Sequence, residues 1–165
     1  MELKIIELPD SGILLYESKH GDGHVVGGHR HPIHQMLFAI DGTGHIRMND
    51  SKHQIGVDSM ALIVPHTDHS IHSEQKLTLL VLAFDMTVLE PVIQQEIVHK
   101  QPYSYVMTMN AFLAADVRQW LRKLMHEQGD QSALGLWSLR NDLQQVLLQV
   151  YRARQHQSAA DSNAL

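Results

Sequence analysis

The chain has 165 residues, a formal net charge of −5, 44% hydrophobic residues and no cysteine. This length suits one well-buried core with an appended helical segment, and the composition is that of a globular protein. The absence of cysteine excludes disulfide bonds and thiolate zinc sites, and the acidic balance argues against tight nucleic-acid binding by this chain. No apolar run is long enough to span a membrane and the first residues lack the pattern of a secretion signal, so we expect a cytoplasmic protein.

Residues 2–84 are predicted to be all-β and antiparallel. The apolar runs "LKIIEL" and "GILLYE" flank the turn sequence "PDSG", and "QMLFAI" and "GHIRMN" flank "DGTG", which is typical of a β-hairpin. The runs "HQIGV", "MALIVP", "HSIHS" and "KLTLLVLAF" follow. Their spacing of roughly 8–12 residues favours a sandwich or a barrel.

The second half changes to a helical period. We expect a short helix around residues 86–99 and a returning strand at "YSYVMTM". Asn110 can cap the next helix, which Gly129 and Asp130 end. A second helix completes an antiparallel pair, and its apolar face comprises Leu136, Leu139, Leu143, Val146, Leu147 and Val150. The residues after 155 are small and polar and are predicted to be flexible.

Histidine is the unusual component, because ten of the 13 histidines lie between His20 and His72. His29 and His31 are two residues apart, so on a strand both side chains face the same side. Gln35 has the same parity if the strand is not bulged. Three imidazoles would converge if His69 lay opposite this strand across a small barrel, which suits zinc, nickel, iron or manganese.

A solvent-facing, histidine-rich surface is the alternative reading of this composition. It is the expected role of the individual residues His24, His34, His45, His53 and His66. His72 is a further candidate for ligand binding, although its parity on a strand differs from that of His69.

The histidine stretch resembles the first cupin motif. Gly23, five residues, His29-x-His31, three residues, Gln35, six residues and Gly42 follow its spacing, with Gln35 in place of the usual glutamate. Pro65 and His69 resemble part of the second cupin motif. The resemblance implies a small antiparallel jelly-roll β-barrel with a divalent metal held by His29, His31 and His69, and with Gln35 as a fourth ligand. A neutral amide is a weaker ligand than a carboxylate, so Gln35 could instead hydrogen-bond an organic ligand.

The barrel interior is expected to form a moderately apolar pocket, lined by Leu37, Ala39, Met60 and Leu62. Together with Gln35 and His72, Leu37 and Ala39 are our candidate ligand-binding residues. The two amphipathic helices offer more apolar face than one barrel edge covers, so we expect a homodimer. Its interface is predicted at Trp120, Leu143, Val146, Leu147 and Val150.

The order of elements over residues 20 to 155 is similar to the sensing half of AraC-type transcriptional regulators. Gln35 after "HRHP" and the stretch "ALIVPHTDHS" fit one subgroup of that family. The resemblance implies a cupin sensing domain at 1–108, a helical dimerisation segment at 109–155 and a flexible linker at 156–165. It also implies a small-molecule effector, and DNA binding only through a helix-turn-helix module missing from this chain.

A ligand-sensing and dimerising module is therefore the leading hypothesis. A free-standing, metal-dependent cupin enzyme (a dioxygenase, isomerase or lyase) is the alternative, and it would need a catalytic base. The barrel acids Asp41, Asp50 and Asp58 look like turn residues, which makes an enzyme less expected. A metal-buffering protein ranks last, because the histidines occupy motif positions and do not form a tract.

Overall fold

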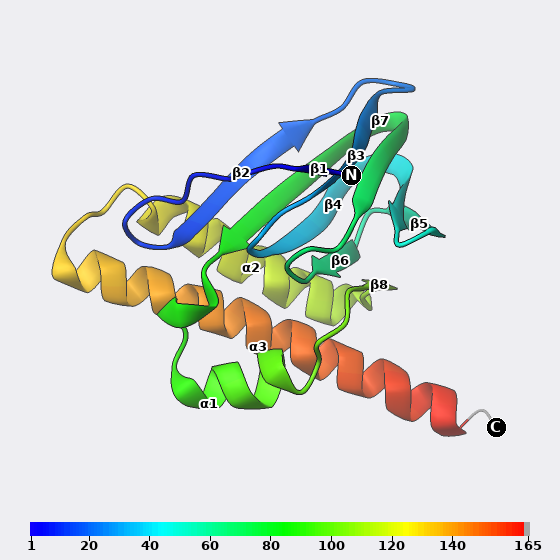
Figure 1. Ribbon diagram of the computed structural model, residues 1–165. Coiled ribbons are helices and arrows are strands. Elements are labelled where there is room, and N and C mark those ends of the chain that lie inside the picture. Colours follow the sequence, from blue (N-terminus) through cyan, green and yellow to red (C-terminus); the bar gives the residue numbers. More distant parts are fainter. Residues whose placement is uncertain (164–165) are drawn as a thin grey trace. The chain divides into compact units, whose positions relative to one another are not determined.

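Two long antiparallel strands, β4 (His34–Met48) and β7 (His69–Phe84), organise the first part of the protein. The computed structural model describes residues 1–163 (Figure 1). The chain divides into two units, a β unit of Met1–Val88 with Pro102–Thr108, and a helical unit of Leu89–Gln101 with the residues from Met109 onward. The β unit also contains β1 (Glu2–Leu3), β2 (Ile13–Lys19), β3 (Val25–Arg30), β5 (Ser51–Gly56), β6 (Ser59–Ile63), β8 (Tyr105–Thr108) and the 3₁₀ turn η1 (Met86–Val88).

Each long strand pairs with different partners along its length. The first half of β4 pairs with β6 and its second half with β5, while β7 pairs first with β3 and then with β2. Two sheets result, β2-β7-β4-β6-β8 and β1-β3-β7-β4-β5, which share β4 and β7. Long strands that belong to two facing sheets are the jelly-roll arrangement of cupins, so the expected fold class, a mainly β unit followed by helices, is confirmed.

The prediction of a hairpin at "DGTG" is wrong. The chain passes straight through Gly42 as part of β4, with register shifts against β7 between Ala39 and Gly44. The runs "HSIHS" and "KLTLLVLAF" likewise form the single strand β7. The run "LKIIEL" forms only β1, which pairs in parallel with β3, whereas the other strand pairs of the described residues are antiparallel.

The core of the β unit is formed by alternate residues of these strands. Leu37 pairs with Ala61 and Gln35 with Ile63, so Ala61 and Ile63 share the inward face with Leu37. The expected pocket residues Met60 and Leu62 are one position out of step and face the other side of β6. A one-residue error reverses the face of every side chain on a strand.

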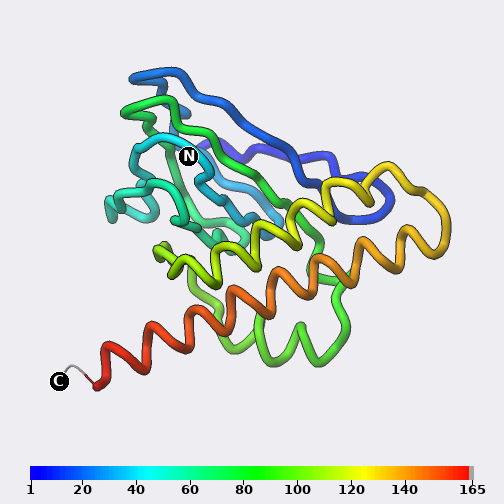
Figure 2. Tube along the Cα trace, turned by 180° about the vertical axis from the view of Figure 1, so that it is seen from behind, coloured from blue at the N-terminus to red at the C-terminus, as the bar shows by residue number. Residues whose placement is uncertain are grey.

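The helical unit begins with α1 (Pro91–Ile93), which continues into the π-helical turn η2 (Gln94–His99). Helices α2 (Ala111–Glu127) and α3 (Ala133–Asn163) lie side by side and antiparallel, as Figures 1 and 2 show. Asn110 caps α2 as expected, because its side-chain oxygen accepts a hydrogen bond from the Leu113 backbone N–H at 3.0 Å.

The strand expected at "YSYVMTM" is present as β8. Helix α3 continues through residues 156–163, where a flexible segment was expected, and residues 164–165 lie outside the described residues. No described helix combines the length and the apolarity that crossing a membrane requires.

Candidate functional site

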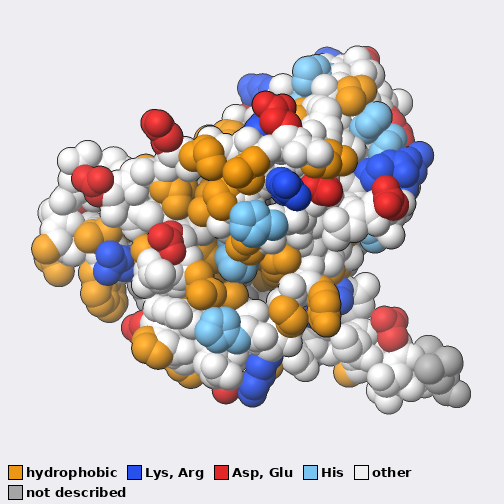
Figure 3. All heavy atoms as spheres, viewed as in Figure 1, with side chains coloured by type: hydrophobic (Ala, Val, Ile, Leu, Met, Phe, Trp, Pro, Cys, Tyr) orange, Lys and Arg blue, Asp and Glu red, His pale blue; other side chains and the backbone are white. Residues whose placement is uncertain are grey.

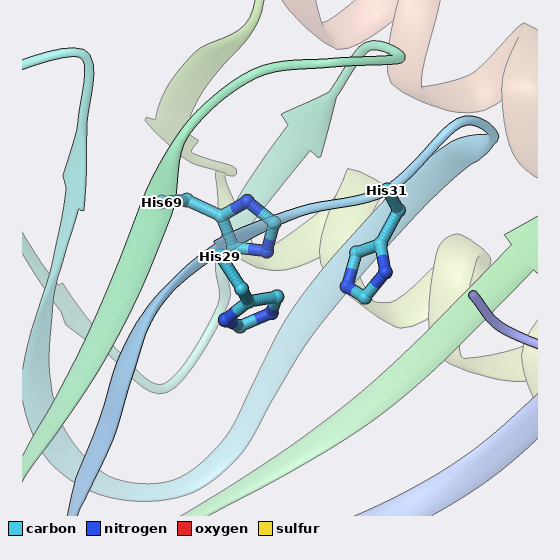
Figure 4. A group of neighbouring side chains, drawn as sticks. All are labelled: His29, His31 and His69. Atoms are coloured by element: carbon cyan, nitrogen blue, oxygen red, sulfur yellow. The ribbon is translucent and has the colours of Figure 1, made fainter. Parts of the chain in front are cut away.

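Three buried histidines meet inside the β unit. His29 belongs to β3, His31 follows that strand, and His69 begins β7. Their ring centroids are separated by 4.7 Å (His29–His31), 4.3 Å (His29–His69) and 5.4 Å (His31–His69). Figure 4 shows the three rings converging on one point, and one nitrogen of each ring lies within 4.8 Å of the others. In the space-filling view, histidine side chains lie among hydrophobic ones at the centre of the visible face (Figure 3).

A β-bulge turns His29 toward the interior. Val26 pairs with Ile71 on β7, so regular pairing would place Gly28 opposite His69. The register instead shifts by one residue, and His29 lies opposite His69. The extra residue in the Gly27–Gly28 stretch reverses the facing of the strand beyond it. His69 therefore lies on the strand next to His29, and not across the barrel as we had expected.

Hydrogen bonds to backbone carbonyls orient all three rings. The Nδ1 atoms of His29, His31 and His69 lie 2.8 Å, 2.7 Å and 2.9 Å from the carbonyl oxygens of Gly27, Lys4 and Thr67. A carbonyl oxygen can only accept, so each neutral ring carries its proton on Nδ1 and keeps its lone pair on Nε2. Backbone carbonyls hold metal-ligating histidines in this tautomer in many metal sites.

Burial lowers the pKa of two of these imidazoles, those of His69 and His31. It lowers the pKa of His69 to about 4, and the neighbouring His29 and His31 lower it further, against the opposing effect of the Thr67 carbonyl. Burial also lowers the pKa of His31. Because only a neutral imidazole can bind a metal ion, the lowered pKa values leave the lone pairs of His31 and His69 available at neutral pH.

The donor set fits a divalent metal. Zinc binds imidazole nitrogen at about 2.0–2.1 Å, which places two ligand nitrogens about 3.3 Å apart in a tetrahedral site. The nitrogens of His29, His31 and His69 lie within 4.8 Å of one another and would need to close by at most about 1.5 Å, which side-chain rotation can supply. Three neutral nitrogens with open positions suit zinc, nickel, iron or manganese.

A cavity of about 280 Å³ opens from the three histidines. Gln35 lies beside them as a polar group, and it is almost fully buried. The opposite lining is apolar and comes from alternate residues of β3, β4 and β7, namely Val26, Leu37, Ile71, Leu79 and Val81. The arrangement places the three histidines in the wall of a small, mostly hydrophobic space.

The structure brings together some of the predicted ligand-binding residues and separates others. Gln35 and Leu37 line the cavity with the histidines. Ala39 is buried in the apolar core, and neither it nor His72 is among the described residues that line this cavity. His72 lies on the opposite face of β7, as its parity indicates. His34, expected to face solvent, is buried and stacks on Phe84 with ring centroids 5.4 Å apart.

Besides the apolar residues Val26, Ile71, Leu79 and Val81, six further cavity residues were missed from the sequence. Tyr16, Ser18 and His20 lie on and just after β2, and their spacing of two residues is a signal that could have identified them. The other three, Lys4, Ile5 and Ile6, follow β1 in an irregular segment whose course no local pattern predicts. Burial raises the pKa of Tyr16 above its ordinary value.

The residues predicted for a dimer interface lie mostly inside the chain. Leu143, Val146, Leu147 and Val150 are each at most 3% exposed, because they pack in the interior of a single copy. Trp120 is partly exposed, and the Lys123 ammonium lies 4.3 Å from its ring centroid. These four aliphatic residues cannot meet a partner without unpacking, so a dimer would have to use the exposed side chains of the helices.

Comparison with solved structures finds proteins of low identity. A variant of oxalate decarboxylase from Bacillus subtilis is 15% identical, with a TM-score of 0.44, over 46% of this chain and 22% of that one. KdgF from Halomonas sp. is 15% identical, with a TM-score of 0.43, over 46% and 71% of the two chains. A cupin superfamily protein from Desulfitobacterium hafniense is 16% identical, with a TM-score of 0.41, over 48% and 83%. The match spans about a fifth of the oxalate decarboxylase chain.

A comparison with curated proteins found no match. A family model described as "AraC-like ligand binding domain" matches residues 11–165, which is nearly the whole chain. The resemblance noted in the sequence is thereby confirmed. The chain belongs to the family of AraC-like ligand binding domains.

Proposed function

We propose that the chain is the effector-sensing module of an AraC-type transcriptional regulator, and that it binds a small organic anion through a divalent metal at His29, His31 and His69. The observation that carries this proposal is the cavity of about 280 Å³ that joins the three histidines to an apolar lining. Its volume lies just below the usual range of small-molecule sites, which favours a small ligand.

The charge of the cavity favours an anion. The three histidines would bind a metal as neutral ligands. Gln35 occupies the position of the glutamate usual in the first cupin motif, whose carboxylate would offset part of the metal charge. The described residues that line this cavity include Lys4 and no Asp or Glu. A bound dication would therefore retain both positive charges, and a carboxylate ligand would offset one of them while placing its carbon chain against Leu37 and Val81.

In this proposal the helical unit joins two copies and a helix-turn-helix module outside this chain binds DNA. The effector changes the DNA affinity of the regulator by binding one arrangement of the dimer more tightly than another. The exposed apolar residues Phe112, Leu134 and Trp137 of α2 and α3 provide surface for the contact between copies.

The test uses isothermal titration calorimetry with Zn²⁺ alone and then with a panel of short-chain carboxylates. We expect one Zn²⁺ per chain and carboxylate binding that requires the metal. Gln35→Glu adds a carboxylate at the same position, so it should tighten Zn²⁺ binding about tenfold or more and weaken the carboxylates. Leu37→Trp should fill the cavity and abolish carboxylate binding while leaving Zn²⁺ bound.

The proposal fails if no Zn²⁺ binds, or if carboxylates bind equally well to the unmodified protein and to Leu37→Trp. The alternative, a metal-dependent enzyme, is favoured by the open coordination positions that three histidines leave. It is distinguished by consumption of a bound carboxylate in the metal-loaded protein, which a sensing module leaves unchanged.

A further inference from the structure

A pair of histidines lies on the outer face of the β unit, away from the three-histidine site. His45 on β4 and His72 on β7 are directly paired in the antiparallel register. Their rings stack with centroids 4.6 Å apart and planes at 20°. We propose that His45 and His72, with Glu74 as an orienting carboxylate, form a second binding site for a late first-row divalent metal such as Cu²⁺.

The strand parity separates this pair from the interior. On β7 the buried residues His69, Ile71 and Ser73 face inward, so His72 faces outward. On β4 the buried Ile46 faces inward, and its neighbour His45 faces outward. The proposed site therefore lies on the other side of the sheet from His69, and the two sites would bind metal independently.

The spacing suits two ligands on one ion. Directly paired residues of an antiparallel ladder have Cβ atoms about 4.5–5.5 Å apart, so two imidazoles can reach a common metal from neighbouring strands. The ring separation of 4.6 Å for His45 and His72 falls within the range of 4.3 to 5.4 Å found among His29, His31 and His69. A turn of each ring about its Cβ–Cγ bond would direct one nitrogen of each toward the same point.

A polar atom without a partner points to the role of Glu74. The Nδ1 atom of His45 is buried and has no hydrogen-bond partner, and it lies 3.5 Å from the Glu74 carboxylate. A small approach would let Nδ1–H donate to that carboxylate, which leaves the Nε2 lone pair of His45 free for a metal. A carboxylate behind a ligating histidine fixes the tautomer and strengthens the imidazole as a ligand.

The surroundings leave room for a small, hydrated ion. Across the neighbouring strands, His72 pairs with the exposed Val25 on β3 and His45 pairs with the exposed Gln54 on β5. Glu74 supplies a negative charge beside the pair. Arg47 and Ser70 form the next outward pair, so one cation stands beside the site and Glu74 offsets it. Two imidazoles with water ligands bind Cu²⁺ more tightly than Ni²⁺ or Zn²⁺.

The test counts Cu²⁺ ions by calorimetry with glycine as competing chelator, and identifies nitrogen ligands by electron paramagnetic resonance. The first protein is His29→Ala/His31→Ala, in which the inner site is disabled. We expect it to bind one Cu²⁺ with two imidazole nitrogens. His72→Asn in that background should remove this ion, and Glu74→Gln should weaken it about tenfold or more.

His24→Asn is the matched control, because His24 pairs with His20 at a ring separation of 5.3 Å in the same unit. This variant should bind Cu²⁺ unchanged. If His29→Ala/His31→Ala does not fold, the comparison is made in the protein that keeps the inner site. There His72→Asn should bind one Cu²⁺ ion fewer than the unmodified protein. Retention of the ion in both His45→Asn and His72→Asn would overturn the proposal, as would equal loss in His24→Asn.

Discussion

Gly42 on β4 lies directly against the backbone carbonyl oxygen of Gln75 on β7. A Cβ atom at Gly42 would clash with that oxygen and with the carbonyl of Lys76. Gly42 also has φ of +80°, a left-handed conformation that residues with a Cβ atom rarely adopt. The "DGTG" sequence is therefore an irregular, bulged segment of β4 where the two longest strands lie close, and not a turn.

Gly42→Ala should lower the free energy of unfolding by about 2 kcal/mol or more, because the clash and the positive φ both oppose the methyl group. Urea unfolding followed by circular dichroism measures this change. Gly21→Ala is the control, since a Cβ there meets nothing within 4 Å. Equal effects of the two substitutions would show that the strands can separate at Gly42 without cost.

Acid should destabilise the metal-free protein through His69. Its pKa is 6.5 in the unfolded chain and about 4 when folded, because burial opposes the charge. Below pH 6.5 the unfolded chain binds a proton at His69, whereas the folded protein binds it only near pH 4. The free energy of unfolding that the neutral His69 side chain contributes is therefore fully present above pH 6.5 and is lost as pH falls toward about 4. The loss amounts to about 3 kcal/mol. Chelator-treated His69→Gln should lack this part of the pH dependence in urea unfolding.

Leu143 is a core residue, so Leu143→Ala should destabilise the protein by about 2–5 kcal/mol in urea unfolding. Leu134→Ala, at a position 81% exposed on the same helix, should change stability by less than about 0.5 kcal/mol. Sedimentation of both variants separates packing from assembly. If the unmodified protein is a dimer and Leu143→Ala is a stably folded monomer, Leu143 belongs to the interface between copies.

Asp142→Asn should stabilise the protein at neutral pH. The Asp142 carboxyl is buried with one oxygen lacking a partner, and burial, with a smaller effect of Glu127, raises its pKa. The ionised group therefore destabilises the folded state at high pH, and the penalty disappears as pH falls below the ordinary pKa of an aspartate. The variant's advantage should vanish in acid. Asp116→Asn, on the exposed face of α2, should show no advantage at either pH.

Local patterns predicted the type of each half and much of the site. Apolar runs between turn residues indicated strands, the helical period indicated α2 and α3, and the spacing of His29 and His31, with the later His69, indicated three candidate metal ligands that the structure brings together. Apart from His69, which meets the other two histidines through the pairing of β3 with β7, these features depend on side chains a few residues apart. Gln35 lines the cavity with the histidines, but it lies on β4 and not on the strand of His29, as the parity argument assumed. Leu37 shares its face because β4 is regular between the two residues.

Features set by distant contacts were not predictable in this way. The bulge before His29 depends on its pairing with β7, and the passage of β4 through Gly42 depends on the nearby Gln75 backbone. The burial of Leu143 and Val146 could not be distinguished from an interface, because an apolar helical face has the same pattern in both cases. Each of these outcomes is decided by a neighbour far away in the sequence.

The carbonyl of Lys4 that orients His31 belongs to the irregular segment after β1, and Ile5 and Ile6 of that segment line the cavity. The segment is attached to β3 by the hydrogen bond from the Lys4 N–H to the Arg30 carbonyl at 2.8 Å. A protein shortened by its first six residues would therefore keep all three histidines and lose a wall of the cavity. It would also leave the His31 ring free to exchange tautomers, so the N-terminus is as much a part of the candidate site as the histidines themselves.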